Sequence, residues 1–162
     1  MLNNLEFYLF QRLNLLKQFD AGDYVLVGCS GGADSLALVW TTLVVGKRLE
    51  LKIGAIIVDH QLIPESNDVA LNAKKQCEEL GIQEVIIKKV NVEQNHEGLE
   101  AAARIARYEA FENVLHETNA QAILLAHTQD DQAETVLMRL TRGSGAKSLS
   151  GMAQVSGKYL RP

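Results

Sequence analysis

The 162-residue chain has few cysteines, no long apolar run and no basic N-terminal segment, and each absence excludes a class of protein. Its two cysteines, Cys29 and Cys77, form no Cys-x-x-Cys pair, which argues against a disulfide framework. No stretch approaches the ~20 apolar residues that a membrane span requires. Residues 1–6 lack the basic start of a signal peptide. We therefore expect a cytosolic protein with no membrane partner.

Basic residues do not outnumber acidic ones, and the formal net charge is −4 at pH 7. Proteins that bind nucleic acids usually carry a basic footprint, so the charge by itself argues weakly against an RNA substrate. The densest basic groups lie at 88–89, 139–147 and 158–161. With 47% hydrophobic and 22% charged residues, the chain has the composition of one globular domain.

Two widespread nucleotide-binding motifs are also missing. The chain has neither the Gly-x-x-x-x-Gly-Lys-Ser/Thr loop nor the dinucleotide fingerprint Gly-x-Gly-x-x-Gly. A different glycine-rich turn stands between an apolar, β-branched run at 24–29 and a helix-favouring run at 36–40. It is the hexapeptide Ser30-Gly31-Gly32-Ala33-Asp34-Ser35.

The hexapeptide has the features of a phosphate-binding site. A strand, a glycine turn and a helix direct free backbone N–H groups and the positive end of the helix dipole at an anion. Gly31 and Gly32 let a phosphate approach the main chain closely, and the hydroxyls of Ser30 and Ser35 add donors. Asp34 places a carboxylate where a phosphate-bound cation would sit. The plainer alternative is a glycine turn with a serine cap, but six specified positions in this context favour the phosphate site.

Strand-like and helix-like segments alternate along the chain. Short apolar runs predict five strands, at 24–29, 51–58, 84–90, 121–126 and 158–161. Helical spacing predicts five helices. The first spans 4–19, the second runs from the hexapeptide to about Lys47, and the others span 66–80, 99–117 and 128–142. Gly81 is expected to cap the third helix at its C-terminus. This alternation predicts an α/β fold, a doubly wound, mostly parallel five-stranded sheet with helices on both faces, similar to a Rossmann fold.

Apolar positions at helical spacing predict which side of three helices is buried. The predicted core positions are Leu5, Leu9, Leu13 and Leu16 in the first helix, Val69, Ala73, Cys77 and Leu80 in the third, and Leu99, Ala102, Ala103, Ala106, Ala110 and Val114 in the fourth. Both cysteines are expected to be buried thiols rather than reactive ones.

Polar side chains gather just after the ends of three predicted strands, at 30–35, 59–60 and 127–131. In an open α/β sheet this carboxyl edge is where ligands bind. Asp131 and Glu134 lie on one face of the helix that begins there. The plain role of Asp131 is to cap the helix N-terminus, but its position at this edge makes both carboxylates candidate site residues.

The hexapeptide resembles the pyrophosphate-binding loop of the N-type ATP pyrophosphatases, the PP-loop superfamily, which split ATP between its α and β phosphates. Six further stretches, in their order and spacing, closely resemble the N-terminal domain of the tRNA(Ile)-lysidine synthetase family. They are Val58-Asp59-His60, Glu100 to Tyr108, Ala126 to Thr135, Arg139 to Gly145, Leu149 to Met152 and Leu160-Arg161-Pro162. The run Asp-Asp-Gln-Ala-Glu-Thr, followed by Arg-Gly-Ser-Gly, is the most specific of these.

The resemblance implies an ATP-dependent ligase that acts on isoleucine tRNA with a CAU anticodon. In that family the C2 oxygen of the wobble cytidine is adenylated, the ε-amine of free L-lysine attacks C2, and AMP leaves. ATP is thus a substrate, and Mg²⁺ is expected with it. The product, lysidine, pairs with A rather than G.

This chemistry suggests roles for individual residues. The six loop residues and His60 are predicted to contact ATP, and Asp34 is predicted to hold Mg²⁺. Arg104 is predicted to steady phosphate or the adenylated intermediate through its planar fork, although its simpler interpretation is part of a solvated, salt-bridged face. Asp131 and Glu134 are predicted to bind the cationic lysine. The predicted catalytic set is therefore Asp34, Arg104, Asp131 and Glu134.

Relatives in this family continue with tRNA-recognising domains. We therefore expect residues 1–162 to be one PP-loop ATP pyrophosphatase domain from the N-terminal part of a longer protein, which would account for the missing basic surface. A tRNA sulfurtransferase of the same superfamily stays open, although it would be expected to use cysteine pairs, and so does a non-catalytic ATP-binding module. An amidotransferase-type synthetase would lack the Asp-Asp-Gln-Ala-Glu-Thr run. The oligomeric state is left open.

Overall fold

A computed structural model of the chain describes residues 3–16, 19–92, 98–126 and 155–161. In these ranges the elements are α1 (Asn4–Leu16), β1 (Tyr24–Gly28), α2 (Ala33–Arg48), β2 (Lys52–Asp59), α3 (Ser66–Glu79), β3 (Val85–Lys89), α4 (Leu99–Thr118), β4 (Ala122–Leu125), β5 (Val155–Ser156) and β6 (Tyr159–Leu160). Helices and strands alternate from α1 to β4, which confirms the predicted α/β class. The helix predicted at 128–142 lies outside the described residues.

The sheet has its strands in the order β3-β2-β1-β4-β6-β5. The five strands from β3 to β6 pair in parallel, as predicted. β5 adds a two-residue edge strand, antiparallel to β6, that is too short to show a periodicity in the sequence. The chain builds outward from β1 through β2 and β3, and then returns to the other side of β1 with β4. Open α/β sheets bind ligands at such a reversal of strand order.

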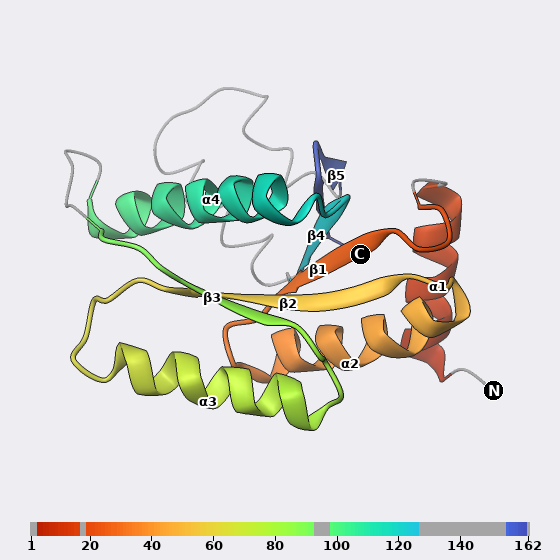
Figure 1. Cartoon of the computed structure of the whole chain (residues 1–162), viewed down its shortest axis with the longest axis horizontal. Helices are drawn as coiled ribbons and strands as arrows, with labels where there is room; N and C mark the ends of the chain where they lie inside the picture. The colour runs from red at the N-terminus through yellow and green to blue at the C-terminus, as the bar shows by residue number, and fades with distance from the viewer. Residues whose placement is uncertain (1–2, 17–18, 93–97, 127–154, 162) are drawn as a thin grey trace, which may run out of the picture.

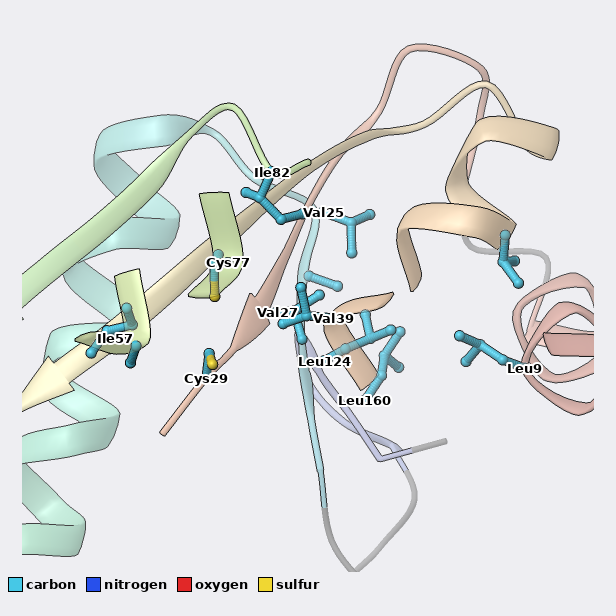
Figure 2. Packing of buried hydrophobic residues seen from close by; sticks show 14 of the residues in the cluster. Leu9, Val25, Val27, Cys29, Val39, Ile57, Cys77, Ile82, Leu124 and Leu160 are labelled. Atoms are coloured by element: carbon cyan, nitrogen blue, oxygen red, sulfur yellow. The ribbon is translucent and has the colours of Figure 1, made fainter. Parts of the chain in front are cut away.

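Helices cover both faces of the sheet, α4 on one face and α1, α2 and α3 on the other (Figure 1). Alternate residues of β1 supply the two cores, since neighbouring side chains of a strand point to opposite faces. Leu26 packs with Phe111 and other residues of α4, whereas Val25 and Val27 pack with the other three helices (Figure 2). The doubly wound arrangement is therefore confirmed. Within the ranges given above, no helix is long and apolar enough to cross a membrane.

Three positions of the predicted buried stripes are wrong. Leu5, Val69 and Leu99 are 54%, 52% and 45% exposed, whereas Leu9 and Leu13 are buried as predicted. All three exposed residues lie in the first turn of their helices. Helical spacing predicts the direction of a side chain, but it does not predict whether another element covers that side chain. A residue in the first turn has neighbouring helical turns on one side only, so it is more easily left exposed.

The end of α3 agrees with the predicted glycine cap. Gly81 has a φ of +103°, its N–H donates to the carbonyl of Glu78 (2.9 Å), and the N–H of Ile82 donates to the carbonyl of Cys77 (3.1 Å). These two bonds satisfy the last carbonyls of the helix in the Schellman arrangement, which favours glycine. They fix the last turn of α3, in which Cys77 lies against the sheet.

Candidate functional site

A cleft of about 530 Å³ opens at the carboxyl ends of β1 and β2, beside the reversal of strand order. Its walls come from the hexapeptide, the end of β2, α4 and the end of β4. The polar and charged part of its lining, with the backbone of the loop, comprises Ser30, Gly32, Ala33, Asp34, Ser35, Asp59, His60, Arg104, Arg107 and Tyr108. The fold therefore brings together the loop, His60 and Arg104, which lie in three separate segments of the sequence.

The hexapeptide is held in shape by Ser35. Its hydroxyl donates to the carbonyl of Gly32 (2.8 Å), accepts from the N–H of Ser30 (3.2 Å) and lies 3.3 Å from the hydroxyl of Ser30. Gly32 caps α2 in an extended conformation, and the first helical bond runs from the N–H of Leu36 to its carbonyl (3.0 Å). The preceding N–H groups, at positions 33–35, have no acceptor within the helix. Free N–H groups at a helix N-terminus are suited to an anion, so this geometry agrees with the predicted phosphate-binding role, which stays a prediction.

Gly31 is placed differently from the other five loop residues. Its φ is +82°, and a Cβ added to it would lie 3.1 Å from the Cβ of Ala73 on α3. Gly31 thus faces α3, while Ser30 and Asp34 line the cleft. Its glycine is required because the turn has a left-handed φ and because α3 packs directly against it.

Asp34 is exposed in the first turn of α2, at the cleft. Among the residues that the structure describes, no group of three or more His, Cys, Asp or Glu side chains could hold a metal ion. Mg²⁺ at phosphate sites typically takes one or two protein carboxylates and completes its shell with phosphate oxygens and water. A single carboxylate beside a phosphate-binding loop fits that requirement.

His60 follows β2 and lines the cleft as a neutral imidazole. Its Nε2 accepts a hydrogen bond from Nε of Arg107 (3.5 Å), and its Nδ1 is buried without a hydrogen-bond partner in the described part of the chain. Burial and the charge of Arg107 lower the pKa of His60, although Asp59 opposes the shift. Asp59 is itself buried, and its Oδ1 accepts the N–H of Gln61 (3.0 Å), which shapes the turn after β2.

The lowered pKa of His60 predicts a pH dependence of stability. Because the folded protein binds the His60 proton less readily than the unfolded chain, the free energy of unfolding should fall as the pH drops below about 6.5. Above that pH the group is neutral in both states and has no effect. Urea unfolding at several pH values gives the free energy of unfolding of the wild type and of His60→Gln. The difference between these two free energies at each pH measures the contribution of His60. A difference that grows in favour of the wild type on acidification would contradict the prediction.

Two arginines of α4 line the cleft. The guanidinium carbon of Arg104 lies 5.2 Å from the centre of the Tyr108 ring, a cation–π contact. Arg107 lies almost one turn further along the helix and reaches His60. Burial and the nearby charge of Arg104 lower the pKa of Arg107, while Tyr108 opposes the shift. Two neighbouring guanidinium groups make this wall attractive to a phosphate.

Arg107 lines the cleft and was not predicted from the sequence as a candidate site residue. The available signal was its spacing of three residues from Arg104, which puts both on neighbouring parts of one helix face. Its contact with His60 spans 47 residues, and no local pattern predicts such a pair. The ion pairs found among the described residues do not include Arg104, so its interpretation as part of a salt-bridged face has no support there.

Tyr108 ties the cleft wall to the edge of the sheet. Its hydroxyl accepts from Nη2 of Arg161 (2.8 Å), and its ring meets the ring of Tyr159 edge-on at 5.0 Å. Tyr159 in turn donates to Glu112 of α4. These contacts hold the helix face that carries Arg104 against β6.

The remaining predicted site residues, Asp131 and Glu134, lie outside the described residues. The chain leaves β4 at the cleft, since Leu125 and Ala126 both line it. The roles of Asp131 and Glu134 therefore stay predictions.

A family model described as a PP-loop domain matches residues 8–162. The chain is 50% identical over 141 residues to the tRNA(Ile)-lysidine synthase of Leifsonia xyli, covering 87% of this chain and 42% of that protein. It is also 50% identical over 147 residues to the enzyme of the same name from Thermobifida fusca, covering 91% and 45%. The chain thus spans less than half the length of these curated relatives.

Among solved structures, the U34-tRNA thiolase NcsA from Methanococcus maripaludis, determined with its 4Fe–4S cluster, has a similar fold. The TM-score is 0.70 at 22% identity, and the match covers 96% of this chain and 58% of the thiolase. At this identity the likeness concerns the fold alone. Because the PP-loop family model matches nearly its whole length, the chain belongs to the PP-loop domain family.

Proposed function

We propose that the chain is the ATP-using domain of a tRNA(Ile)-lysidine synthetase. The observation that carries the proposal is the 50% identity to such enzymes over 87–91% of the chain. The cleft supports it, because a phosphate-binding loop, a carboxylate and two arginines face one space. The substrates would be ATP, free L-lysine and isoleucine tRNA with a CAU anticodon, and such a reaction belongs in the cytosol.

In the proposed reaction the cytosine C2 oxygen attacks the α-phosphorus of ATP, and pyrophosphate leaves. The N–H groups at 33–35 and the hydroxyl of Ser30 would hold the departing phosphates, and Arg104 and Arg107 would offset negative charge on the opposite wall. Asp34 would bind Mg²⁺, which supplies charge neutralisation and orients the phosphates. The lysine amine then attacks C2, loses a proton and displaces AMP.

Glu134→Ala tests the proposed lysine site. The KM for lysine should rise by roughly tenfold or more, since a charge-assisted hydrogen bond is worth ~1.5–3 kcal/mol, while the KM for ATP should change little. Steady-state AMP formation with each substrate varied in turn measures both constants. Glu79→Ala, which removes an exposed carboxylate from α3, is the control and should change neither constant. Equal effects of Glu134→Ala on the two KM values would refute the lysine assignment.

The proposed activity is tested by multiple-turnover release of AMP and pyrophosphate from ATP. The assay contains Mg²⁺ and unmodified isoleucine tRNA, with and without lysine, and uses both this chain and a longer protein that carries tRNA-recognising domains. The longer protein should form AMP only with tRNA and lysine together. If lysine makes no difference to it, the proposed substrate is wrong, and the loop serves another adenylating reaction.

We also propose that residues 1–162 form one PP-loop domain and that most of the tRNA contacts lie elsewhere in the protein. If so, the 162-residue chain binds ATP but modifies tRNA poorly in the assay above. A sulfurtransferase role has less support, since the two cysteines are both buried and separated by 47 residues rather than paired in a Cys-x-x-Cys motif. A non-catalytic ATP-binding module would show no lysine-dependent release of pyrophosphate.

A further inference from the structure

Two thiols meet directly beneath the phosphate-binding loop. Cys29 follows β1 and is 4% exposed, and Cys77 lies on α3 and is fully buried. Both belong to the same core cluster, and Figure 2 shows the sulfur of Cys77 directed toward Cys29. The two side chains therefore lie as neighbours in this cluster. The fold thus pairs the two cysteines, although nothing in their sequence spacing suggests it.

The sulfur of Cys29 is also part of the hydrogen-bond network of the loop. It accepts from the N–H of Gly31 (3.4 Å) and lies 3.6 Å from the hydroxyl of Ser35, which closes the loop. The neighbouring thiol of Cys77 lowers the pKa of Cys29, with help from Ser35 and Gly31, although burial opposes the shift. The neighbouring Cys29 and burial raise the pKa of Cys77. Since Gly31 and Ser35 contact only the sulfur of Cys29, Cys29 is the more acidic thiol of the two.

Access to solvent distinguishes the two thiols as well. Cys29 is a lining residue of the cleft, although only 4% of it is exposed, whereas Cys77 has no exposed surface. An oxidant that enters the cleft therefore meets Cys29 before Cys77. A thiol that meets the oxidant first, with a second thiol beside it, is the arrangement in which the first is oxidised and the second resolves it.

We propose that Cys29 and Cys77 form a reversible disulfide when a peroxide reaches the cleft, and that this disulfide weakens ATP binding. The crosslink itself depends only on the geometry of the two thiols. Its effect on ATP rests on the proposed role of the loop.

The chemistry balances with hydrogen peroxide as the oxidant. The Cys29 thiolate attacks one peroxide oxygen, so that an S–O bond forms, the O–O bond breaks and hydroxide leaves. The Cys77 thiol then loses its proton and attacks the sulfenic sulfur of Cys29, so that the S–S bond forms, the S–O bond breaks and water leaves. Two thiols have lost two hydrogen atoms, and one peroxide has become two waters. A dithiol reductant reverses the reaction by exchange.

The effect on the loop follows from its contacts. A disulfide requires the sulfurs to approach to roughly 2.0 Å, so the sulfur of Cys29 is drawn toward Cys77 and away from its contacts with Gly31 and Ser35. α3 already touches the loop, because Ala73, one turn before Cys77, packs against Gly31. The disulfide sulfur is also a poorer acceptor for the N–H of Gly31 than a thiolate. Both changes alter the turn that directs N–H groups at the phosphate.

The crosslink is tested by mass spectrometry after treating the 162-residue chain with hydrogen peroxide and alkylating the remaining thiols. The wild type should lose both free thiols together, become lighter by two hydrogen atoms and yield a Cys29–Cys77 peptide pair under non-reducing conditions. Cys77→Ala should instead leave a Cys29 sulfenic acid that dimedone traps. Cys29→Ala should leave Cys77 unmodified. Unreacted thiols in the wild type, a sulfinic acid without the crosslink, or only intermolecular disulfides would each overturn the proposal.

The consequence for ATP is measured by calorimetric titration of reduced, oxidised and re-reduced protein. Oxidation should weaken ATP binding by about tenfold or more, equivalent to ~1.4 kcal/mol, and dithiothreitol should restore it. Oxidised Cys77→Ala carries a sulfenic acid on Cys29 but no crosslink, so it should lose clearly less affinity than the tenfold step of the oxidised wild type. An intact crosslink with unchanged ATP affinity would overturn the regulatory part. Failure of the reduced protein to bind ATP would instead count against the proposed function.

Discussion

Asp34→Asn should lower kcat/KM for AMP formation by about 100-fold or more, because it removes the proposed metal-binding charge while keeping the shape of the side chain. Asp34 is exposed at the mouth of the cleft, so its contribution to folding comes mainly from the helix dipole. The free energy of unfolding should therefore fall by no more than about 1 kcal/mol. Initial rates at varied Mg²⁺, with urea unfolding of the same preparations, measure both effects.

Asp68→Asn is the matched control for this change. Asp68 is also an exposed carboxylate in the first turn of a helix, α3, but it lies outside the cleft lining. It should show the same small loss of stability and no loss of rate. If Asp34→Asn reduces the rate no more than Asp68→Asn does, the assignment of Asp34 to the metal is wrong.

Gly31→Ala should reduce both stability and ATP affinity. An alanine at a φ of +82° costs ~1–2 kcal/mol, and its Cβ, 3.1 Å from the Cβ of Ala73, must also displace α3 or the loop. Displacing the turn moves the N–H groups at 33–35 away from the phosphate. The loss of one charge-assisted hydrogen bond of ~1.5–3 kcal/mol would weaken ATP binding by roughly tenfold or more.

Gly22→Ala is the control that separates the effect of backbone strain from the effect on the phosphate-binding loop. Gly22 has a similar φ of +91°, but nothing lies within 4 Å of a Cβ added there. Its alanine variant should lose stability through the φ strain alone and should bind ATP normally. Calorimetric titration with ATP and thermal unfolding of both variants test this contrast. Normal ATP binding by a folded Gly31→Ala protein would show that the turn does not form the phosphate site.

Much of the fold is determined by local patterns in the sequence. The run from Tyr24 to Gly28 has apolar side chains on both faces of the strand, as expected for a strand that is covered on both faces. The structure shows helices on both faces of the sheet. Glycines at 31 and 32 end that strand in a turn, and the helix follows at once. Because strand, turn and helix depend on neighbouring residues, their order and the α/β class could be predicted.

Local patterns fail where the outcome depends on what lies opposite a residue. Leu5, Val69 and Leu99 have the spacing of a buried stripe but are exposed, since no neighbouring element covers the first turns of their helices. The short strand β5 forms because β6 lies beside it, and its two residues carry no signal of their own.

The same division applies to the candidate site. The phosphate-binding character of the hexapeptide and the predicted role of Asp34 follow from residue types and their order along the chain, whereas the lysine-binding role predicted for Asp131 and Glu134 follows from the family resemblance. Only the tertiary structure placed Arg107 on His60 and brought Cys29 and Cys77 into one core cluster. These pairs join side chains that lie far apart in the sequence. Sequence spacing predicts which face of a helix or strand a residue occupies, but it does not predict which other element packs against that face.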